Sequence, residues 1–262
     1  MNSTPRANVL GVGISALSMS EAIGAADLLL QAAGSGYVCV TGVHGVMEAQ
    51  GDSCFKQVLN ASFLNLPDGM PTVWVGKWQG FRGMGRVYGP DFMLELCALS
   101  VKRGYKHFLY GGKPGVAEDL REKLLQRFPG LQIVGTYTPP FRPLNSAEEA
   151  DLRAMLARET PDVFWCGIST PKQEKFMAQY FGNLPVRLMV GVGAAFDINS
   201  GRVPDAPRFM KQMGLQWVHR MMTEPRRLAR RYLTNNPRFI WLTCQQLSGL
   251  RQYELEPTNL AE

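Results

Sequence analysis

The sequence predicts an α/β protein with a mostly parallel sheet, helices on both faces and a helical C-terminal appendage. Short apolar, β-rich runs alternate with longer amphipathic runs over the first 200 residues, a pattern typical of strand–helix units. Beyond about residue 200 the β-rich runs stop, and arginine, methionine and tryptophan accumulate. The chain has 262 residues, 45% of them hydrophobic and 19% charged, which is enough to bury a full core.

Seven segments are expected to be strands because they are short, apolar and rich in β-branched or aromatic residues. They are Val9–Ile14, Tyr37–Thr41, Phe63–Leu66, His107–Tyr110, Gln132–Gly135, Val163–Cys166 and Val186–Val190.

Six amphipathic runs are expected to be helices. They are Ser20–Ala33, Val46–Asn60, Pro90–Arg103, Pro114–Phe128, Ser146–Arg158 and Pro171–Phe181. Serine at an N-cap and proline in a first turn favour these starting points. The run from Val46 is expected to break near Gly51.

The appendage is expected to cover residues 207–262, beside a core of residues 1–206, with helix breaks at Pro225 and Pro237. Residues 201–262 hold 10 Lys and Arg against 5 Asp and Glu, whereas residues 1–200 hold 18 against 17. The net charge of +6 is therefore a local patch, which indicates a local anionic partner.

Four arginines carry the patch, in pairs at helical i, i+4 spacing, and aromatic residues follow them. They are Arg226, Arg227, Arg230 and Arg231. This pattern suits anionic lipid headgroups or a lipid diphosphate. A nucleic-acid backbone and an ordinary solvated helix face are the alternatives.

Cysteine usage and hydropathy indicate a compartment. The five cysteines are an odd number without a CxxC pair, which favours a reducing cytoplasm over a disulfide framework or a zinc site. No apolar run approaches the ~20 residues that cross a bilayer. The N-terminal stretch has no convincing cleavage site, so it is expected to be mature protein.

Polar residues follow two expected strands in the segment 162–207. Gly167, Ser169 and Thr170 come after the first strand, before a helix that starts with Lys172-Gln173-Glu174. Gly191 and Gly193 come after the second, before Phe196-Asp197. Open α/β sheets bind ligands at the carboxyl ends of their strands, where helix N–H groups attract anions. The segment predicts one wall of a site for a phosphorylated ligand.

Two further turns are expected at the same edge. Thr41 ends one strand and is followed by His44, and Asp68 lies in a Pro-Asp-Gly turn after the next strand. Such a turn can expose a carboxylate in a cleft, although Pro-Asp-Gly turns are also common as simple connections between elements. His44 fits a base or a hydrogen-bonded turn histidine equally well.

Other nucleotide motifs are incomplete. Gly11-x-Gly13-x-x-Ala16 matches a dinucleotide fingerprint, but the next expected strand ends without the acid that holds a ribose. A dehydrogenase therefore stays an alternative only. Lys77, Arg82 and Arg86 lie in a Gly-rich stretch that suits a mobile loop over phosphates or a plain solvated loop. There is no Asp-x-Asp pair to hold a metal on a diphosphate.

Several segments together resemble the WecG/TagA/CpsF family of bacterial glycosyltransferases (glycosyltransferase family 26). They are VTGVHGV around Thr41, LPDGM at 66–70, RVYGPDF at 86–92, YGGKPG at 110–115, GISTPKQEKF at 167–176, GVGAAFDINSGRVPDAP at 191–207 and GLQWVHRMMTEPRRLARRY at 214–232. The resemblance covers about residues 8–245 in order, and the whole set makes it specific.

The resemblance implies a Rossmann-like catalytic core and an inverting transfer of a hexose or N-acetylhexosamine. The donor would be a UDP-sugar and the acceptor a polyprenyl-diphosphate-linked saccharide, in exopolysaccharide or cell-surface polymer synthesis. It implies no metal cofactor, no nucleic acid, and docking of the appendage on an anionic membrane at the inner, cytoplasmic face of the cell membrane. Donor sugar, acceptor linkage and oligomeric state, a homo-oligomer included, stay open.

The resemblance also implies site residues. Asp68 corresponds to the general base, with Thr41 as a second catalytic residue. Arg86, Gln173 and Asp197 correspond to donor-binding positions, and the four tail arginines to acceptor or membrane contacts. Many relatives carry Asn where Val43 stands here, and His44 is expected to take over that polar contact.

Overall fold

The structure is a computed structural model that describes residues 4–255, without the side chains of residues 208, 212 and 227. It contains two compact units. The described part of the first unit comprises residues 4–18, 41–87 and 204–255, and the second comprises residues 19–40 and 88–203. The expected boundary between residues 206 and 207 stays a prediction.

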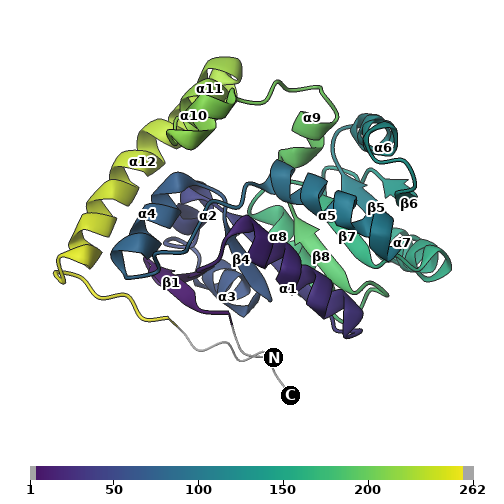
Figure 1. Cartoon of the computed structure of the whole chain (residues 1–262), viewed down its shortest axis with the longest axis horizontal. Helices are drawn as coiled ribbons and strands as arrows, with labels where there is room; N and C mark the ends of the chain where they lie inside the picture. Colours follow the sequence, from purple (N-terminus) through teal and green to yellow (C-terminus); the bar gives the residue numbers. More distant parts are fainter. Residues whose placement is uncertain (1–3, 256–262) are drawn as a thin grey trace. The chain divides into compact units, whose positions relative to one another are not determined.

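The main sheet has six parallel strands in the order β4-β3-β8-β7-β5-β6, flanked by helices (Figure 1). The strands are β3 (Gly36–Thr41), β4 (Leu64–Pro67), β5 (Lys106–Gly111), β6 (Gln132–Tyr137), β7 (Val163–Gly167) and β8 (Leu188–Gly191). This confirms the predicted α/β class. The last strand begins at Leu188, two residues later than expected, because Val186 lies in a turn closed by its N–H bond to Leu184 O.

Six helices belong to the second unit. They are α1 (Met19–Gln31), α5 (Gly89–Arg103), α6 (Val116–Arg127), α7 (Ser146–Glu159), α8 (Lys172–Tyr180) and α9 (Ala195–Asn199). The short α9 was not expected. Helix α5 ends where Gly104 takes the left-handed conformation (φ 75°) and its N–H bonds to Ser100 O at 2.8 Å.

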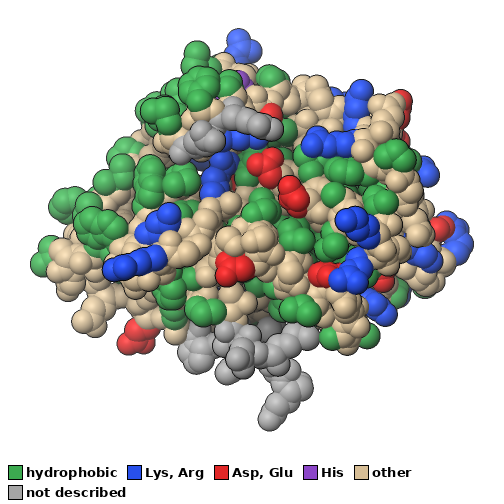
Figure 2. Space-filling view, in the orientation of Figure 1, with side chains coloured by type: hydrophobic (Ala, Val, Ile, Leu, Met, Phe, Trp, Pro, Cys, Tyr) green, Lys and Arg blue, Asp and Glu red, His purple; other side chains and the backbone are tan. Residues whose placement is uncertain are grey.

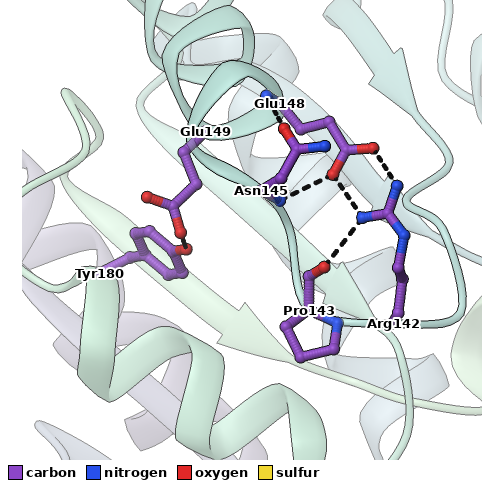
Figure 3. A network of polar contacts seen from close by, with 6 residues as sticks. All are labelled: Arg142, Pro143, Asn145, Glu148, Glu149 and Tyr180. Carbon is purple, nitrogen blue, oxygen red and sulfur yellow. Dashed lines mark hydrogen bonds and ion pairs between the residues drawn. The ribbon is translucent and has the colours of Figure 1, made fainter.

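The start of α7 is fixed by a capping box (Figure 3). Asn145 Oδ1 accepts the Glu148 N–H at 2.9 Å, and Glu148 Oε2 accepts the Asn145 N–H at 2.8 Å. Arg142 donates to both Glu148 oxygens at 2.7 Å, and together these donors lower the pKa of Glu148 to about 2. The nearby Tyr180 hydroxyl donates to Glu149, which ties α8 to α7.

The core of the second unit contains stacked aromatic rings on β5, β7 and α8. Tyr110 lies 4.7 Å from Phe176 between ring centroids, and Phe108 stacks on Phe164 at 5.8 Å. Trp165 Nε1 donates to His107 Nδ1 at 2.8 Å, so the neutral imidazole carries its proton on Nε2. Complete burial lowers the pKa of His107 to about 3.

The first unit opens with a β-hairpin, so the expected single strand Val9–Ile14 was wrong. Strands β1 (Arg6–Val9) and β2 (Val12–Ser15) pair antiparallel in a separate two-stranded sheet. Leu10 and Gly11 form the turn with φ values of 55° and 81°. Positive φ at both turn residues is the geometry that matches the twist of a two-residue hairpin.

Three helices follow within the first unit: α2 (Val43–Glu48), α3 (Ser53–Ala61) and α4 (Met70–Trp78). The expected break near Gly51 is confirmed, and Asp52 caps α3 by accepting the Phe55 N–H at 2.9 Å. Helix α4 was not expected. Lys77 lies in its last turn rather than in a loop.

The appendage consists of α10 (Arg208–Gln212), α11 (Gln216–Thr223) and α12 (Pro225–Leu247). Proline begins α12 as expected at Pro225, but the break expected at Pro237 was wrong, because α12 continues through it. Both Pro237 and Leu233, four residues earlier, are exposed, so the carbonyl that loses its N–H partner lies on the solvated side. Within residues 4–255 no helix is long and apolar enough to cross a membrane.

The far end of α12 is fastened to the hairpin. Gln246 accepts the Leu10 N–H at 3.0 Å and donates to Asn8 O at 2.9 Å. Helix α12 also packs on α2 through part of its length. The appendage therefore belongs to the same compact unit as Thr41, His44, Asp68 and Arg86.

Candidate functional site

Thr41 and Asp68 lie side by side in the first unit, at the ends of β3 and β4. The Asp68 N–H donates to Thr41 O at 3.2 Å, and the Thr41 side chain is buried. A Cβ atom on Gly42 would lie 3.7 Å from Asp68 Oδ2, so the glycine leaves space beside the carboxylate. Asp68 is half-exposed and comes directly before Gly69, the N-cap of α4. The expected proximity of these turns is confirmed.

Arg86 holds the Asp68 turn through a hydrogen bond and also contacts the appendage. Its Nε donates to Asp68 O at 2.7 Å, Nη1 to Lys211 O at 3.5 Å, and Nη2 to Gln216 Oε1. A guanidinium offers five N–H donors in a rigid fork, and here it links the catalytic candidate to the appendage. The predicted contact of Arg86 with a donor diphosphate stays a prediction.

His44 also lies against the appendage. Its Nδ1 lies 3.4 Å from Asn235 Nδ2 on α12 and 3.5 Å from Glu48 Oε1, one turn along α2. The ring is thus anchored between α2 and α12. These contacts do not test the predicted role of His44 in binding the donor, which stays a prediction.

The second unit brings Gln173 and Glu174 together at the start of α8, after β7. Gln173 Nε2 donates to Glu174 Oε1 at 2.9 Å, and Thr170 Oγ1 donates to the same oxygen at 2.8 Å. Both side chains are almost fully buried. Within the described residues, Gln173 Oε1 and Glu174 Oε2 are buried acceptors without a hydrogen-bond donor.

Burial raises the pKa of Glu174 to about 6, although the hydrogen bonds from Thr170 and Gln173 oppose the rise. The free acceptor of Gln173 faces the turn after β8. A Cβ atom on Gly193 would lie 3.5 Å from Gln173 Oε1. Gln173 Oε1 is thus a buried orphan acceptor beside a glycine turn at the carboxyl end of a parallel sheet, a position suited to a ligand N–H or O–H donor.

Asp197 lies in α9, half-exposed, just beyond β8. Its backbone is held because the Val203 N–H and the Ser200 hydroxyl bond to Asp197 O at 3.0 and 3.1 Å. The neighbouring Phe196 is buried over Gly167, where an added Cβ atom would collide with its ring. These contacts fix the backbone position of Asp197. The residue lies just after the Gly191–Gly193 turn that follows β8.

The tail arginines lie on α12. Arg226 and Arg230 are exposed and Arg231 is half-exposed, whereas the side chain of Arg227 lies outside the described residues. Leu228 is buried, whereas Trp241 is 66% exposed, so the outer side of α12 carries apolar side chains as well as arginines. Figure 2 shows hydrophobic side chains over α10, α11 and α12 with Lys and Arg beside them.

Sequence reasoning missed Glu174 and the contacts between the core loops and the appendage. A Gln-Glu pair in the first turn of a helix usually faces solvent, so nothing in the sequence marked Glu174 as buried. Among residues 4–255 no group of three or more His, Cys, Asp and Glu side chains is placed to hold a metal ion. That a diphosphate is handled without a metal stays a prediction.

Comparison with known proteins gives a consistent picture. Residues 7–253 match the model of the glycosyl transferase WecG/TagA/CpsF family. The chain is 31% identical over 180 residues, 68% of each chain, to an N-acetylglucosaminyldiphosphoundecaprenol N-acetyl-beta-D-mannosaminyltransferase of Bacillus subtilis strain 168. It is 30% identical over 183 residues, 70% of this chain and 69% of the other, to the protein of that name from Bacillus spizizenii.

Proposed function

Because the chain belongs to the WecG/TagA/CpsF family of glycosyl transferases, we propose that it moves a sugar from a UDP-sugar to a polyprenyl-diphosphate-linked saccharide with inversion. The names of the two Bacillus relatives support the lipid-linked acceptor, since both act on an N-acetylglucosaminyl group on diphosphoundecaprenol. The product would enter a cell-surface polymer or exopolysaccharide. The donor hexose is left open.

The chemistry is a single displacement with Asp68 as general base. The Asp68 carboxylate takes the proton of an acceptor hydroxyl while that oxygen bonds to the anomeric carbon of the donor. The bond from that carbon to the UDP oxygen breaks, and UDP leaves with the electron pair. The observation that carries this proposal is the half-exposed Asp68 carboxylate beside Thr41, held at the carboxyl ends of two strands. Thr41, joined to this turn through its backbone carbonyl, would be the second catalytic residue.

Replacement of Asp68 by Asn tests the base. Loss of a general base costs ~10²–10⁴ in rate, so kcat should fall by that factor while UDP affinity stays unchanged. Asp52→Asn is the matched control, because Asn caps a helix as well as Asp and activity should persist. Near wild-type turnover of Asp68→Asn would refute the assignment. An inverted anomeric configuration in the product, measured by NMR, tests the stereochemistry.

The donor side of the proposal rests on Gln173 and Asp197. Since Gln173 Nε2 already donates to Glu174, the amide offers the donor substrate an acceptor, Oε1. An acceptor repels phosphate oxygens, so Gln173 would bind a sugar hydroxyl or a base N–H rather than the diphosphate. Asp197 would accept from the ribose or the uracil. Gln173→Ala and Asp197→Asn should each weaken UDP-sugar binding in calorimetry, and unchanged affinity would contradict the roles.

The remaining part of the proposal concerns the membrane and the alternatives. Arg226 and Arg230 would bind anionic headgroups or the lipid diphosphate, so the protein would work peripherally at the inner face of the cell membrane.

UDP at 100 times its Kd should stabilise the fold by about 2.7 kcal/mol. NAD or duplex DNA should not, and stabilisation by either would favour a dehydrogenase or a nucleic-acid-binding protein instead.

A further inference from the structure

Tryptophan is distributed unevenly between the two units. Trp165 is fully buried in the second unit. The other four tryptophans all lie in the first unit on the surface, with Trp78 77%, Trp241 66%, Trp74 51% and Trp217 36% exposed. Tryptophan is usually well buried, so a cluster of exposed indoles marks a surface that meets an apolar partner.

Two of the exposed tryptophans lie on α4, outside the appendage. The opposite face of α4 is packed, with Val73, Val75 and Gly76 buried. Trp74, Lys77 and Trp78 are exposed and follow the i, i+3, i+4 spacing of one helix face. Helix α4 thus presents a single outer face with two indoles and one ammonium group.

This face adjoins the appendage within the same unit. Gly214, in the turn between α10 and α11, packs on α4: an added Cβ atom would lie 3.1 Å from Met70 Cβ and 3.4 Å from the Trp74 ring. Met213, next to that turn, is 63% exposed, and Phe209 on α10 is 61% exposed. The segment that contacts α4 therefore carries exposed apolar side chains of its own.

The chain segment that contains α4 is predominantly basic. Between Ser53 and Pro90 the only acidic residue is Asp68, whereas Lys77 and Arg82 are exposed cations. Indole rings with neighbouring Lys or Arg are characteristic of the headgroup layer of anionic bilayers, where rings sit at the interface and cations reach phosphate groups. A nucleic acid or an acidic protein would select the cations without requiring two exposed indoles on an otherwise apolar surface.

We propose that α4 is a second membrane contact, in which Trp74, Lys77 and Trp78 enter the headgroup layer of an anionic bilayer beside the appendage. This contact goes beyond docking through the tail arginines. It has a consequence for catalysis, because Asp68 lies two residues before α4 and the nine-residue helix is only about 13 Å long. Docking of α4 holds the Asp68 turn near the headgroups, the level at which a lipid diphosphate presents its sugar.

Quenching by brominated lipids tests the contact in the full-length chain. The Trp217→Phe/Trp241→Phe variant keeps the two α4 indoles and the buried Trp165. Its fluorescence should be quenched by brominated phosphatidylglycerol–phosphatidylcholine vesicles and much less by brominated phosphatidylcholine alone. Adding Trp74→Phe and Trp78→Phe leaves only Trp165, and quenching should disappear. Unquenched fluorescence of the first variant on vesicles that bind it would overturn the proposal.

Vesicle affinity gives a second measurement. Each indole that leaves water removes on the order of 100 Å² of apolar surface, so Trp74→Ser/Trp78→Ser should bind the anionic vesicles at least about tenfold more weakly. Leu28→Ser, at a 63% exposed site on α1 of the second unit, is the matched control and should bind like wild type. Thermal unfolding confirms that each variant is folded.

The outcomes separate this contact from the proposed function. If Arg226→Gln/Arg230→Gln weakens vesicle binding and Trp74→Ser/Trp78→Ser does not, the tail docks alone and the α4 contact is refuted. If the tryptophan variant loses affinity and the arginine variant does not, α4 is the contact and the tail assignment fails. A wild-type protein that binds no anionic vesicles refutes both, while leaving the transferase chemistry to its own assay.

Discussion

The buried Glu174 carboxyl yields a quantitative prediction about stability and pH. Its pKa in the folded protein is about 6 against 4.5 for the ordinary side chain, because burial disfavours the charged form. A rise of about 1.5 units corresponds to about 2 kcal/mol at 1.36 kcal/mol per unit. The folded state holds the proton more tightly than the unfolded state, so this group favours folding at low pH. That advantage is lost as the pH rises through the window from about 4.5 to 6.

Glu174→Gln removes the titrating group and keeps the shape. The unfolding free energy of wild type minus that of the variant should fall by about 2 kcal/mol from pH 4 to pH 8, with most of the change between pH 4.5 and 6. Urea denaturation at a series of pH values measures both proteins. The difference between them is needed because other groups titrate in the same range.

His107 is one such group, and its effect has the opposite sign. Its pKa is lowered to about 3 by burial, so the unfolded state binds a proton below about 6.5 that the folded state refuses. Stability from this histidine is therefore lost as the pH falls from 6.5 toward 3. The two effects offset each other in wild type and separate in the variant. A pH-independent difference between wild type and Glu174→Gln would refute the burial argument.

Three further predictions follow from the described contacts. In His107→Gln the unfolding free energy from urea denaturation should fall less steeply below pH 6.5 than in wild type. An unchanged dependence on pH below 6.5 would contradict the assigned effect of burial. Arg86→Lys should lower kcat at least about tenfold and the unfolding free energy by about 1–2 kcal/mol, because an ammonium group cannot keep all three guanidinium contacts. Equal values of kcat and of unfolding free energy for both proteins would show that these contacts are dispensable. Chelation by EDTA should leave turnover unchanged, and activity that returns only with a divalent cation would refute metal independence.

The parallel sheet was predictable because strands covered on both faces appear as nearly continuous apolar runs. The hairpin was not. Val9–Ile14 has the apolar composition of one buried strand, and its turn depends on Leu10 in the left-handed region at φ 55°. A non-glycine residue in that region leaves no signal in the sequence. Pro237 misled for a related reason, since whether a proline ends a helix depends on the solvent exposure of the carbonyl that it frees.

The site was predictable only in part. Thr41 and Asp68 were expected to lie together because both follow parallel strands, and a 3.2 Å hydrogen bond joins them. The contacts of Arg86 with Lys211 and of His44 with Asn235 join residues 125 and 191 positions apart. Periodicity and turn chemistry are local, so they carry no information on such pairs.

The cost of burying the Glu174 carboxylate is linked to the proposed donor site through Gln173. Above about pH 6 its carboxylate is ionised and can only accept hydrogen bonds, so the amide group of Gln173 must turn its NH₂ toward it. The other end, Oε1, is thereby fixed toward Gly193 as an acceptor for the ligand. In Glu174→Gln that constraint is gone, because a neutral amide both donates and accepts and either orientation of Gln173 is allowed. Glu174→Gln, which lacks the cost of the buried charge at pH 8, should therefore bind the donor more weakly and show a higher donor KM. The buried charge is unfavourable for folding, and a loss of donor affinity in this variant would show that the charge serves binding by orienting Gln173.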